Sequence, residues 1–463
     1  MNTLPAMKQD RPPHPMPITT VSQDGSIASF LAKASEDPLS SAFDRKFTIH
    51  AGMGGPAAEP SETEAAFEAV LNQRPGNGLA IYIHVPFCHN QCLYCGFSGR
   101  RPEGELCAAY TDALTAEIKW WKDRPASAGA VRAVYLGGGT PTALEPSQLD
   151  RILSALAGNF DLANDCEITL EGRLHDFSRE RAAGFIAAGF NRFSIGIQSF
   201  DTAVRRGLGR ISDREKVIDT LSQLIGRQKA AVIIDLIYGL PGQSPDDFVN
   251  DLKAAEKLGV DGLDTYQLNV FPGSKLALAV EEKRIAPPAA LSDQGEYYRM
   301  ASEYLLGRRW KQLSLSHFAL TSRERNIYNP WAKKRGDCLA LGAGAGGFLS
   351  GWSFYRRPDL EQYLKNAAAG RFAPEMVSPP APNRLLSSFI VEQMEQGYLN
   401  HRQLMERFGV PPEPLGRLMR NWSENELVTI DDEWLTMTLN GRFWGVNLTQ
   451  AVIETAGHSM KEN

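Results

Sequence analysis

Three cysteines that stand within eight residues, in the pattern Cys88-x3-Cys92-x2-Cys95, are the residues best suited to chemistry in this chain. Thiolates this close together in one loop can hold a single compact multi-metal centre. Structural zinc normally takes four protein ligands in paired knuckles, and the chain has no second cysteine pair, although His84 or His89 could supply a fourth ligand. A redox disulfide is a further alternative. The spacing favours a 4Fe-4S cluster in which one iron has no cysteine ligand.

A glycine run, Gly137-Gly138-Gly139-Thr140-Pro141-Thr142, indicates what the open iron could bind. Glycines let backbone amides and carbonyls approach a ligand's carboxylate or ammonium group closely, and Thr140 adds a hydroxyl. A plain strand-to-helix turn is the alternative for such a run. Glu171, Gln198 and Asp235 add polar groups at or near the ends of three later predicted strands. Their joint placement, rather than any one of them, indicates a ligand site.

Six apolar or β-branched runs alternate with helical stretches and position these groups. We expect strands at residues 79–85, 131–136, 167–171, 191–197, 231–237 and 262–270. Strands in this order, without hairpin signals between them, require a parallel sheet with helical crossovers. The predicted fold class is therefore α/β, an incomplete (βα)6 parallel barrel with a small C-terminal winged-helix-like domain.

Changes in composition divide the chain into three parts. Residues 1–75 are rich in Pro, Ala, Ser and Glu and are predicted to form an extended, partly disordered N-terminal arm with one short helix near residues 61–71. Residues 76–373 are predicted to form the barrel domain with a C-terminal extension, which loosens through a Gly-rich stretch. Residues 383–463 follow a Pro-rich linker and are predicted to form the winged-helix-like domain, with a strand pair flanking Asp431 and Asp432.

The composition excludes several classes of protein. With 43% hydrophobic and 22% charged residues, the chain is globular rather than disordered or fibrous. A formal charge of -5 gives no argument for nucleic acid or a membrane as a partner, and the C-terminal part has more acids than bases. No export signal and no apolar run of about 20 residues is visible, so we expect a cytoplasmic protein with reduced thiols. Cys107, Cys166 and Cys338 are expected to be small buried apolar residues.

Four segments carry a resemblance to a known family. They are Ile83-His84-Val85-Pro86-Phe87-Cys88 running into Cys95, the Gly-Gly-Gly-Thr-Pro-Thr run, Ser194-Ile195-Gly196-Ile197-Gln198-Ser199-Phe200, and Asp235-Leu236-Ile237-Tyr238-Gly239-Leu240-Pro241-Gly242. These segments resemble radical S-adenosylmethionine (SAM) enzymes, in the branch that contains oxygen-independent coproporphyrinogen III dehydrogenase. In that branch the open iron chelates the amino and carboxylate groups of S-adenosylmethionine, and reductive cleavage gives a 5'-deoxyadenosyl radical.

The resemblance implies a cofactor site. It makes Cys88, Cys92 and Cys95 the ligands of the 4Fe-4S cluster. It also implies nine residues that contact S-adenosylmethionine: Tyr82, Tyr94, Gly138, Gly139, Thr140, Glu171, Gln198, Arg210 and Asp235. The guanidinium of Arg210 can pair bidentately with a methionine carboxylate, although a surface salt bridge is the alternative for this residue.

Other segments indicate which group within this branch the chain resembles most. In the coproporphyrinogen enzyme another cysteine follows the third cluster cysteine by two positions, whereas this chain has Phe97. Four other segments resemble a heme-utilisation group, which degrades heme without oxygen. They are Glu171-Gly172-Arg173, Asp213-Arg214, Ser316-His317-Phe318 and Arg323-Glu324-Arg325-Asn326-x-Tyr328-Asn329. That resemblance implies that a methyltransferase opens the porphyrin at a meso carbon, with methyl transfer from S-adenosylmethionine, and yields a linear tetrapyrrole and free iron.

Heme is accordingly the expected substrate, and a low-potential donor such as flavodoxin or ferredoxin is the expected electron source. His317 is the candidate catalytic residue or heme ligand, with His89 and His175 as further candidates, and a structural histidine is the alternative for each. Arg323 and Arg325 are candidate partners for heme propionates. Two other functions stay open: a chaperone that binds intact heme and hands it over, and coproporphyrinogen III dehydrogenation.

Overall fold

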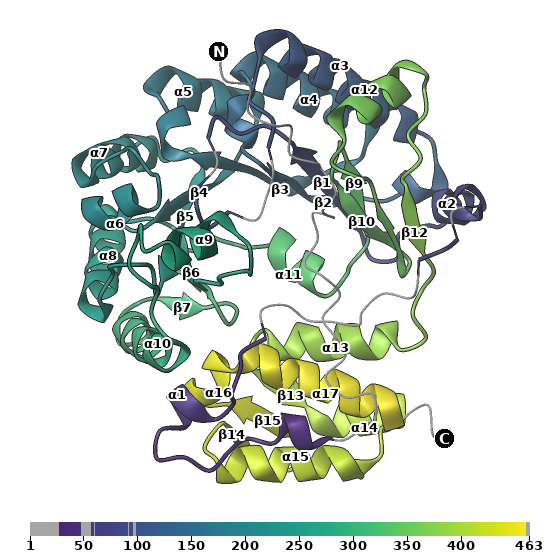
Figure 1. The fold of residues 1–463 in the computed structure, drawn as a ribbon. Helices are drawn as coiled ribbons and strands as arrows, with labels where there is room; N and C mark the ends of the chain where they lie inside the picture. Colours follow the sequence, from purple (N-terminus) through teal and green to yellow (C-terminus); the bar gives the residue numbers. More distant parts are fainter. Residues whose placement is uncertain (1–26, 48–56, 60, 91, 96–98, 460–463) are drawn as a thin grey trace.

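The computed structural model describes residues 27–47, 57–59, 61–90, 92–95 and 99–459, and its centre is a curved sheet of six parallel strands (Figure 1). These strands are β1 (Leu79–Val85), β2 (Val131–Gly138), β3 (Leu162–Arg173), β4 (Arg192–Gln198), β5 (Ala231–Tyr238) and β6 (Gly262–Gln267). They pair in chain order. In β1 every residue except Tyr82 is buried, as expected for a strand covered on both faces. The predicted incomplete barrel is confirmed, and its sixth strand is shorter than expected.

Helices connect the strands and cover the outside of the sheet (Figure 1). They are α3 (Gly104–Trp121), α4 (Pro146–Asn159), α5 (Arg179–Ala188), α6 (Thr202–Gly207), α7 (Arg214–Ile225) and α8 (Pro245–Leu258), and α9 (Lys275–Glu281) and α10 (Leu291–Leu306) follow β6. N-cap side chains mark where five of them begin, and each accepts a hydrogen bond from the backbone of its helix: Ser178 for α5, Asp201 for α6, Asp213 for α7, Ser244 for α8 and Ser274 for α9. These caps fix the lengths of the strand-to-helix loops, from which an active site at this end of a barrel is built.

Short strands extend both edges of the parallel sheet. β8 (His317–Ala319) runs antiparallel to β6 and pairs with β7 (Lys311–Gln312). On the other edge β9 (Cys338–Leu341) runs parallel to β1 and is followed by β10 (Gly346–Leu349), β11 (Trp352–Tyr355) and β12 (Met376–Ser378). Residues 320–337, which include α11 (Tyr328–Lys333), connect the two edges. The Gly-rich part of the C-terminal extension, in which no strands were predicted, therefore contributes strands to a twelve-stranded sheet.

A C-terminal module, residues 384–459, lies beneath this sheet in Figure 1. Its elements are α13 (Arg384–Met394), β13 (Tyr398–Asn400), α14 (His401–Phe408), α15 (Pro412–Glu424), β14 (Val428–Ile430), β15 (Trp434–Met437), α16 (Leu439–Phe443) and α17 (Gly445–Ser459). The antiparallel sheet β13-β15-β14 includes the strand pair expected around Asp431. The first six elements, three helices and three strands from α13 to β15, follow the order expected of a winged-helix-like module, and α16 and α17 come after them.

The described part of the N-terminal arm packs against this C-terminal module. Trp422 Nε1 donates to the carbonyl oxygen of Phe30 at 2.9 Å, and Trp444 Nε1 donates to that of Pro38 at 3.0 Å. The short helix α1 (Pro38–Ser41) contacts both α10 and α16, and α2 (Thr63–Leu71) is the helix predicted in this region. The first 25 residues, expected to be poorly ordered, lie outside the described residues. Within the described ranges, no helix combines the length and apolar character that crossing a bilayer requires.

Candidate active site

The cysteine loop begins directly after β1, at the carboxyl end of the parallel strands. Cys88 and Cys92 are buried, and Cys95 is half-buried. Leu93 and Tyr94 pack against a separate apolar cluster at this end of the barrel, which consists of Val204, Leu208, Ile237, Leu240, Leu268 and Leu276. Leu93 and Tyr94 thus hold the loop against the barrel, so the anchoring contacts come from apolar side chains rather than from the thiols. The position of Phe97 lies outside the described residues.

The loop after β2 approaches the cysteine loop closely. Thr140 Oγ1 is 3.1 Å from Cys88 Sγ, and Arg173 Nη2, from the end of β3, donates to the same sulfur at 3.5 Å. A Cβ atom on Gly139 would lie 2.5 Å from the carbonyl oxygen of Phe87, so only glycine permits this approach. Hydroxyl and guanidinium donors beside a thiolate stabilise an anionic metal cluster.

Hydrogen bonds join the cysteine loop to the end of β4. Arg210 Nη2 donates to Tyr94 Oη at 2.6 Å, and Nη1 donates to the carbonyl oxygen of Gly196 at 2.8 Å. Arg210 Nε and Gln198 Oε1 are buried and have no hydrogen-bond partner among the described residues. Buried polar atoms are normally paired, so a leftover donor and a leftover acceptor beside a metal-binding loop fit a zwitterionic ligand.

Three carboxylates line the neighbouring interior of the barrel, from Glu171 in β3, Asp235 in β5 and Asp264 in β6. Burial raises the pKa of Glu171, although hydrogen bonds donated by Tyr135 Oη and the backbone N–H of Gly138 oppose this rise. Burial, together with the charges of Asp264 and Glu171, raises the pKa of Asp235 to about 7. A buried group of acids of this kind favours a ligand that carries positive charge.

Tyr82 faces the same interior from β1. Its hydroxyl is 3.1 Å from His84 Nδ1, and its ring stacks at 6.4 Å on Tyr135 and at 6.2 Å on Tyr328. The structure therefore brings the predicted cofactor residues together at one end and in one interior. Tyr94, Thr140, Gln198 and Arg210 lie at the cysteine loop or at the end of β4. Gly138 and Gly139 lie where β2 ends. Tyr82, Glu171 and Asp235 lie in the interior of the barrel.

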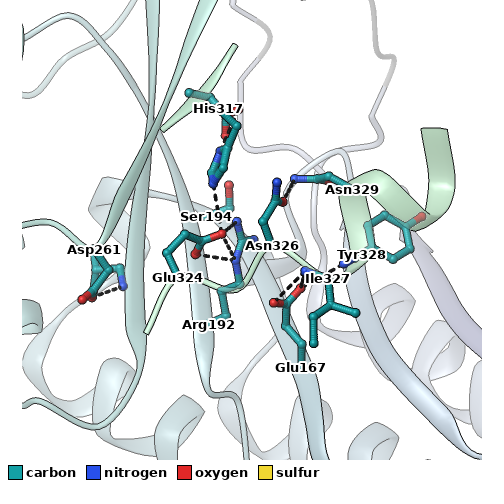
Figure 2. Close-up of polar contacts among 12 residues, drawn as sticks. Glu167, Arg192, Ser194, Asp261, His317, Glu324, Asn326, Ile327, Tyr328 and Asn329 are labelled. Atoms are coloured by element: carbon teal, nitrogen blue, oxygen red, sulfur yellow. Dashed lines mark hydrogen bonds and ion pairs between the residues drawn. The ribbon is translucent and has the colours of Figure 1, made fainter. Parts of the chain in front are cut away.

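His317 lies on the antiparallel edge beside β6 (Figure 2), where it adjoins Asp264, one of the three interior carboxylates. It is 1% exposed; its Nδ1 is 3.0 Å from Asp264 Oδ1 and its Nε2 is 3.0 Å from Glu324 Oε1. Burial by itself lowers the pKa of His317, but the two carboxylates outweigh burial and raise it to about 9. An imidazolium at pH 7 has no free nitrogen lone pair for heme iron. Both ring nitrogens of His317 face carboxylates, and its predicted catalytic role stays a prediction.

Glu324 extends this network to the amino end of the barrel (Figure 2). Its carboxylate accepts hydrogen bonds from Arg192 Nε and Nη2, each at 3.0 Å, and neither side chain is more than 2% exposed. The nearby carboxylate of Glu167 accepts hydrogen bonds from the backbone N–H groups of Ile327 and Tyr328. The segment that resembles the heme-utilisation group thus closes the amino end of the barrel.

Arg323 and Arg325, the candidate propionate partners, also lie at the amino end. Arg323 pairs with Asp261 at 2.8 Å, and Arg325 pairs with Asp165 at 3.3 Å. A cavity of about 260 Å³ opens beside them, but the arginines that line it, which include Arg192, are paired with carboxylates. The structure therefore separates both arginines from the cysteine loop.

Exposed apolar side chains border the carboxyl end of the barrel. Ile211, directly after Arg210, is 81% exposed, Tyr266 in β6 is 42% exposed, and Val270 and Phe271 after β6 are 38% and 45% exposed. Exposed apolar side chains next to a polar site suit the binding of a large, partly apolar molecule.

Sequence reasoning gave no role to three residues that the structure places in the site. Arg173 contacts Cys88, Tyr135 donates to Glu171, and Asp264 influences Asp235. The position of Arg173 at the carboxyl end of a predicted strand was the signal that could have identified it. Asp264 could have been found from its place in the sixth predicted strand, where an acidic residue inside an apolar run is unexpected.

Comparisons with known proteins bear directly on this site. A family model described as the radical SAM superfamily matches residues 82–255, the part of the chain that holds the three cysteines, Arg210 and Asp235. Anaerobilin synthase of Escherichia coli O157:H7 is 37% identical over 375 residues, which cover 81% of this chain and 83% of that protein.

Two other kinds of relative are similar over a smaller share of the chain. The heme chaperone HemW of Lactococcus lactis is 28% identical, covering 64% of this chain and 75% of its own. Oxygen-independent coproporphyrinogen III oxidase of Escherichia coli K12 is 30% identical, covering 65% and 68%. A solved structure of coproporphyrinogen III oxidase from Escherichia coli, described as a radical SAM enzyme, shares the fold with a TM-score of 0.72 at 23% identity, covering 87% of this chain and 96% of that one.

Proposed function

The chain belongs to the radical S-adenosylmethionine superfamily, in the branch of the coproporphyrinogen III oxidases and heme chaperones, and from this premise we propose that it degrades heme without oxygen. Its cofactors are a 4Fe-4S cluster and S-adenosylmethionine. In this proposal a methyltransferase reaction opens the porphyrin to a linear tetrapyrrole and releases iron. The observation that carries the proposal is the 37% identity, over 81% of the chain, to a relative named anaerobilin synthase.

Cys88, Cys92 and Cys95 are the residues proposed to hold the cluster. Three thiols in one anchored loop, with the hydroxyl of Thr140 and the guanidinium of Arg173 beside Cys88, fit an anionic cluster with one open iron. When bound, the cluster and S-adenosylmethionine supply the radical chemistry that no side chain provides. The protein's own task is to hold these groups in position and to exclude water.

The polar groups next to the loop are proposed to hold S-adenosylmethionine. Arg210 Nε is a buried donor suited to a carboxylate, and Gln198 Oε1 is a buried acceptor suited to an ammonium group. The acidic interior formed by Glu171 and Asp235 suits the positive sulfonium side of the molecule. The glycines and Thr140 of the β2 loop and the rings of Tyr82 and Tyr94 complete the proposed site.

The apolar border of the barrel mouth is proposed to receive the heme. Ile211, Val270 and Phe271 are exposed beside Arg210 and β6, where a macrocycle could lie with one edge toward the cluster. Arg323 and Arg325 lie at the amino end, so the propionates are proposed to point to solvent or to other groups. A low-potential donor such as flavodoxin or ferredoxin remains the proposed electron source.

Transfer of a labelled methyl group tests this function. The reconstituted protein is incubated anaerobically with heme, a reductant and S-adenosylmethionine labelled in its methyl group. We expect label in a linear tetrapyrrole, and we expect Arg210→Gln to remove it, whereas Arg206→Gln, at an exposed position on α6, retains it. Unlabelled, intact heme would favour a chaperone instead, and conversion of coproporphyrinogen III would favour the dehydrogenase.

A further inference from the structure

Two histidines and an aspartate meet beside the cysteine loop. His89 directly follows Cys88, and His175 and Asp176 lie in the short 3-10 helix η4 (Leu174–Asp176) after β3. The nitrogen and oxygen atoms that these three side chains offer all lie within 4.8 Å of one another. His175 Nε2 is 3.2 Å from Asp176 Oδ1, and the rings of His89 and His175 meet edge to face with centroids 5.9 Å apart. The three side chains are close enough to share one ion.

Asp176 is oriented by a set of outer contacts. Thr142 Oγ1 donates to Asp176 Oδ2 at 2.7 Å, which leaves Oδ1 facing His175. Arg181 Nε donates to the carbonyl oxygen of Asp176 at 3.1 Å, and its Nη2 donates to that of Thr142 at 2.7 Å. A Cβ atom on Gly172 would lie 2.5 Å from Thr142 Cγ2, so glycine there lets Thr142 approach the aspartate. Ligands held by outer hydrogen bonds of this kind are typical of metal sites.

We propose that His89, His175 and Asp176 form a site for a divalent transition-metal ion, and that this site receives the ferrous ion released when heme is opened. Two imidazoles and one carboxylate suit Fe(II) and leave further positions to water, so the ion can exchange. Arg173, whose guanidinium contacts Asn90 next to His89, adds a positive charge that weakens retention of the ion. The source of the ion rests on the proposed function, because only ring opening frees iron.

The site lies where such an acceptor is needed. His89 belongs to the same loop as the cluster cysteines, and Thr142, which orients Asp176, belongs to the same glycine-rich run as Thr140, which contacts Cys88. Iron released from a macrocycle bound at this end of the barrel would leave it at the same end as the three ligands, two of which, His89 and His175, are exposed.

Binding of 57Fe(II) to the anaerobic holoprotein tests the site without turnover. The cluster is first built from 56Fe, which gives no Mössbauer signal, and bound 57Fe(II) is then measured by equilibrium dialysis and by Mössbauer spectroscopy. We expect one high-spin ferrous ion per chain. His175→Ala and Asp176→Asn should lower its affinity about tenfold or more, and Thr142→Val by about tenfold. His401→Ala, in the C-terminal module, is the matched control and should bind as the unaltered protein does.

Five results separate the possibilities. The site is overturned if 57Fe appears only in the cluster, or if its binding is the same in His175→Ala and Asp176→Asn. It is also overturned if His175→Ala changes the absorption band of bound heme and leaves Fe(II) binding unchanged, because His175 would then be an axial ligand. Heme opening without an Fe(II) site removes this inference alone, whereas an Fe(II) site without heme opening removes the proposed function and leaves the metal site.

Discussion

The two ends of the barrel differ in whether their buried polar groups are paired. At the amino end, Arg192 and Glu324 are paired and almost completely buried. At the carboxyl end, Arg210 Nε and Gln198 Oε1 are buried without a partner among the described residues. Buried charges that are fully paired contribute to one unique structure, whereas buried polar groups left over are available to a ligand. We infer that the carboxyl end binds the ligand and that the amino end holds the barrel in shape.

The loop segments at the two ends differ in the same sense. Residues 320–337 connect the two edges of the sheet, and Glu167 holds them through the backbone of Ile327 and Tyr328 (Figure 2). The cysteine loop is anchored by Leu93 and Tyr94, which pack against the apolar cluster at this end of the barrel. Substitutions at the amino end should therefore change stability first, and substitutions at the carboxyl end should change activity first.

The largest expected effect is at the carboxyl end, in Cys92→Ala. Loss of one of three cluster ligands should abolish both the visible absorption of the cluster and all turnover. Cys107→Ala, which removes a buried thiol from α3, is the control and should keep both signals. Turnover retained in Cys92→Ala would contradict the radical mechanism.

Arg192→Met should have the largest effect at the amino end. It leaves Glu324 buried without its partner, which costs about 3–5 kcal/mol of the free energy of unfolding. Urea unfolding followed by tryptophan fluorescence measures this change, and Arg192→Met/Glu324→Leu should restore part of the stability. The exposed pair of Arg325 and Asp165 offers a control, because Arg325→Ala should cost less than about 1 kcal/mol. Equal losses in the two single variants would remove the contrast between buried and exposed pairs.

His317→Gln should change how stability depends on pH. The pKa of His317 is raised to about 9 in the folded protein, above its ordinary value of 6.5. Its contribution to stability is therefore fully present below pH 6.5 and is lost as the pH rises through 9. The variant should lose this dependence, which amounts to roughly 3 kcal/mol at most. Urea midpoints at pH 6 and pH 9.5 measure it, and a heme spectrum altered by the substitution would instead place His317 at the substrate.

Asp235→Asn should have a smaller effect of the opposite kind. The pKa of Asp235 is raised from 3.8 to about 7, so the folded protein loses stability as the pH rises from about 4 to 7. Asparagine does not ionise, so the variant should gain roughly 2 kcal/mol relative to the unaltered protein between pH 5 and pH 8. Urea unfolding at these two pH values gives the comparison. A parallel pH dependence of stability in both proteins would show that burial and the charges of Glu171 and Asp264 do not raise the pKa of Asp235.

Much of the barrel follows from the sequence because its strands are long apolar runs. The run at residues 79–85 predicted β1 without error. The glycine run was expected after the second strand, but its first two glycines, Gly137 and Gly138, are the last residues of β2. β9, β10 and β11 were not predicted, because each has only four residues, in or next to a Gly-rich stretch, and four residues are too few to show a strand's periodicity. The loop that carries the proposed cluster ligands was predicted from the spacing of its cysteines, which can be read from residues close together in the sequence.

The amino-end network was beyond the sequence for a physical reason. Arg192 and Glu324 are separated by 132 residues, and nothing local marks them as partners. The sequence likewise does not show whether His317 is buried between Asp264 and Glu324 or exposed to a substrate. The contacts that orient Asp176 also come from separate turns, so only the fold brings Thr142, Arg181 and His89 to one place.

The measurement that tests the central claim most directly follows heme and nucleoside together. The reconstituted protein is incubated anaerobically with heme, S-adenosylmethionine and a low-potential reductant, while the heme absorption band and 5'-deoxyadenosine are recorded. If the carboxyl end is the active end of a heme-degrading enzyme, the band is lost as 5'-deoxyadenosine appears. Heme that binds and stays intact, with no nucleoside formed, would contradict the proposal and favour a chaperone.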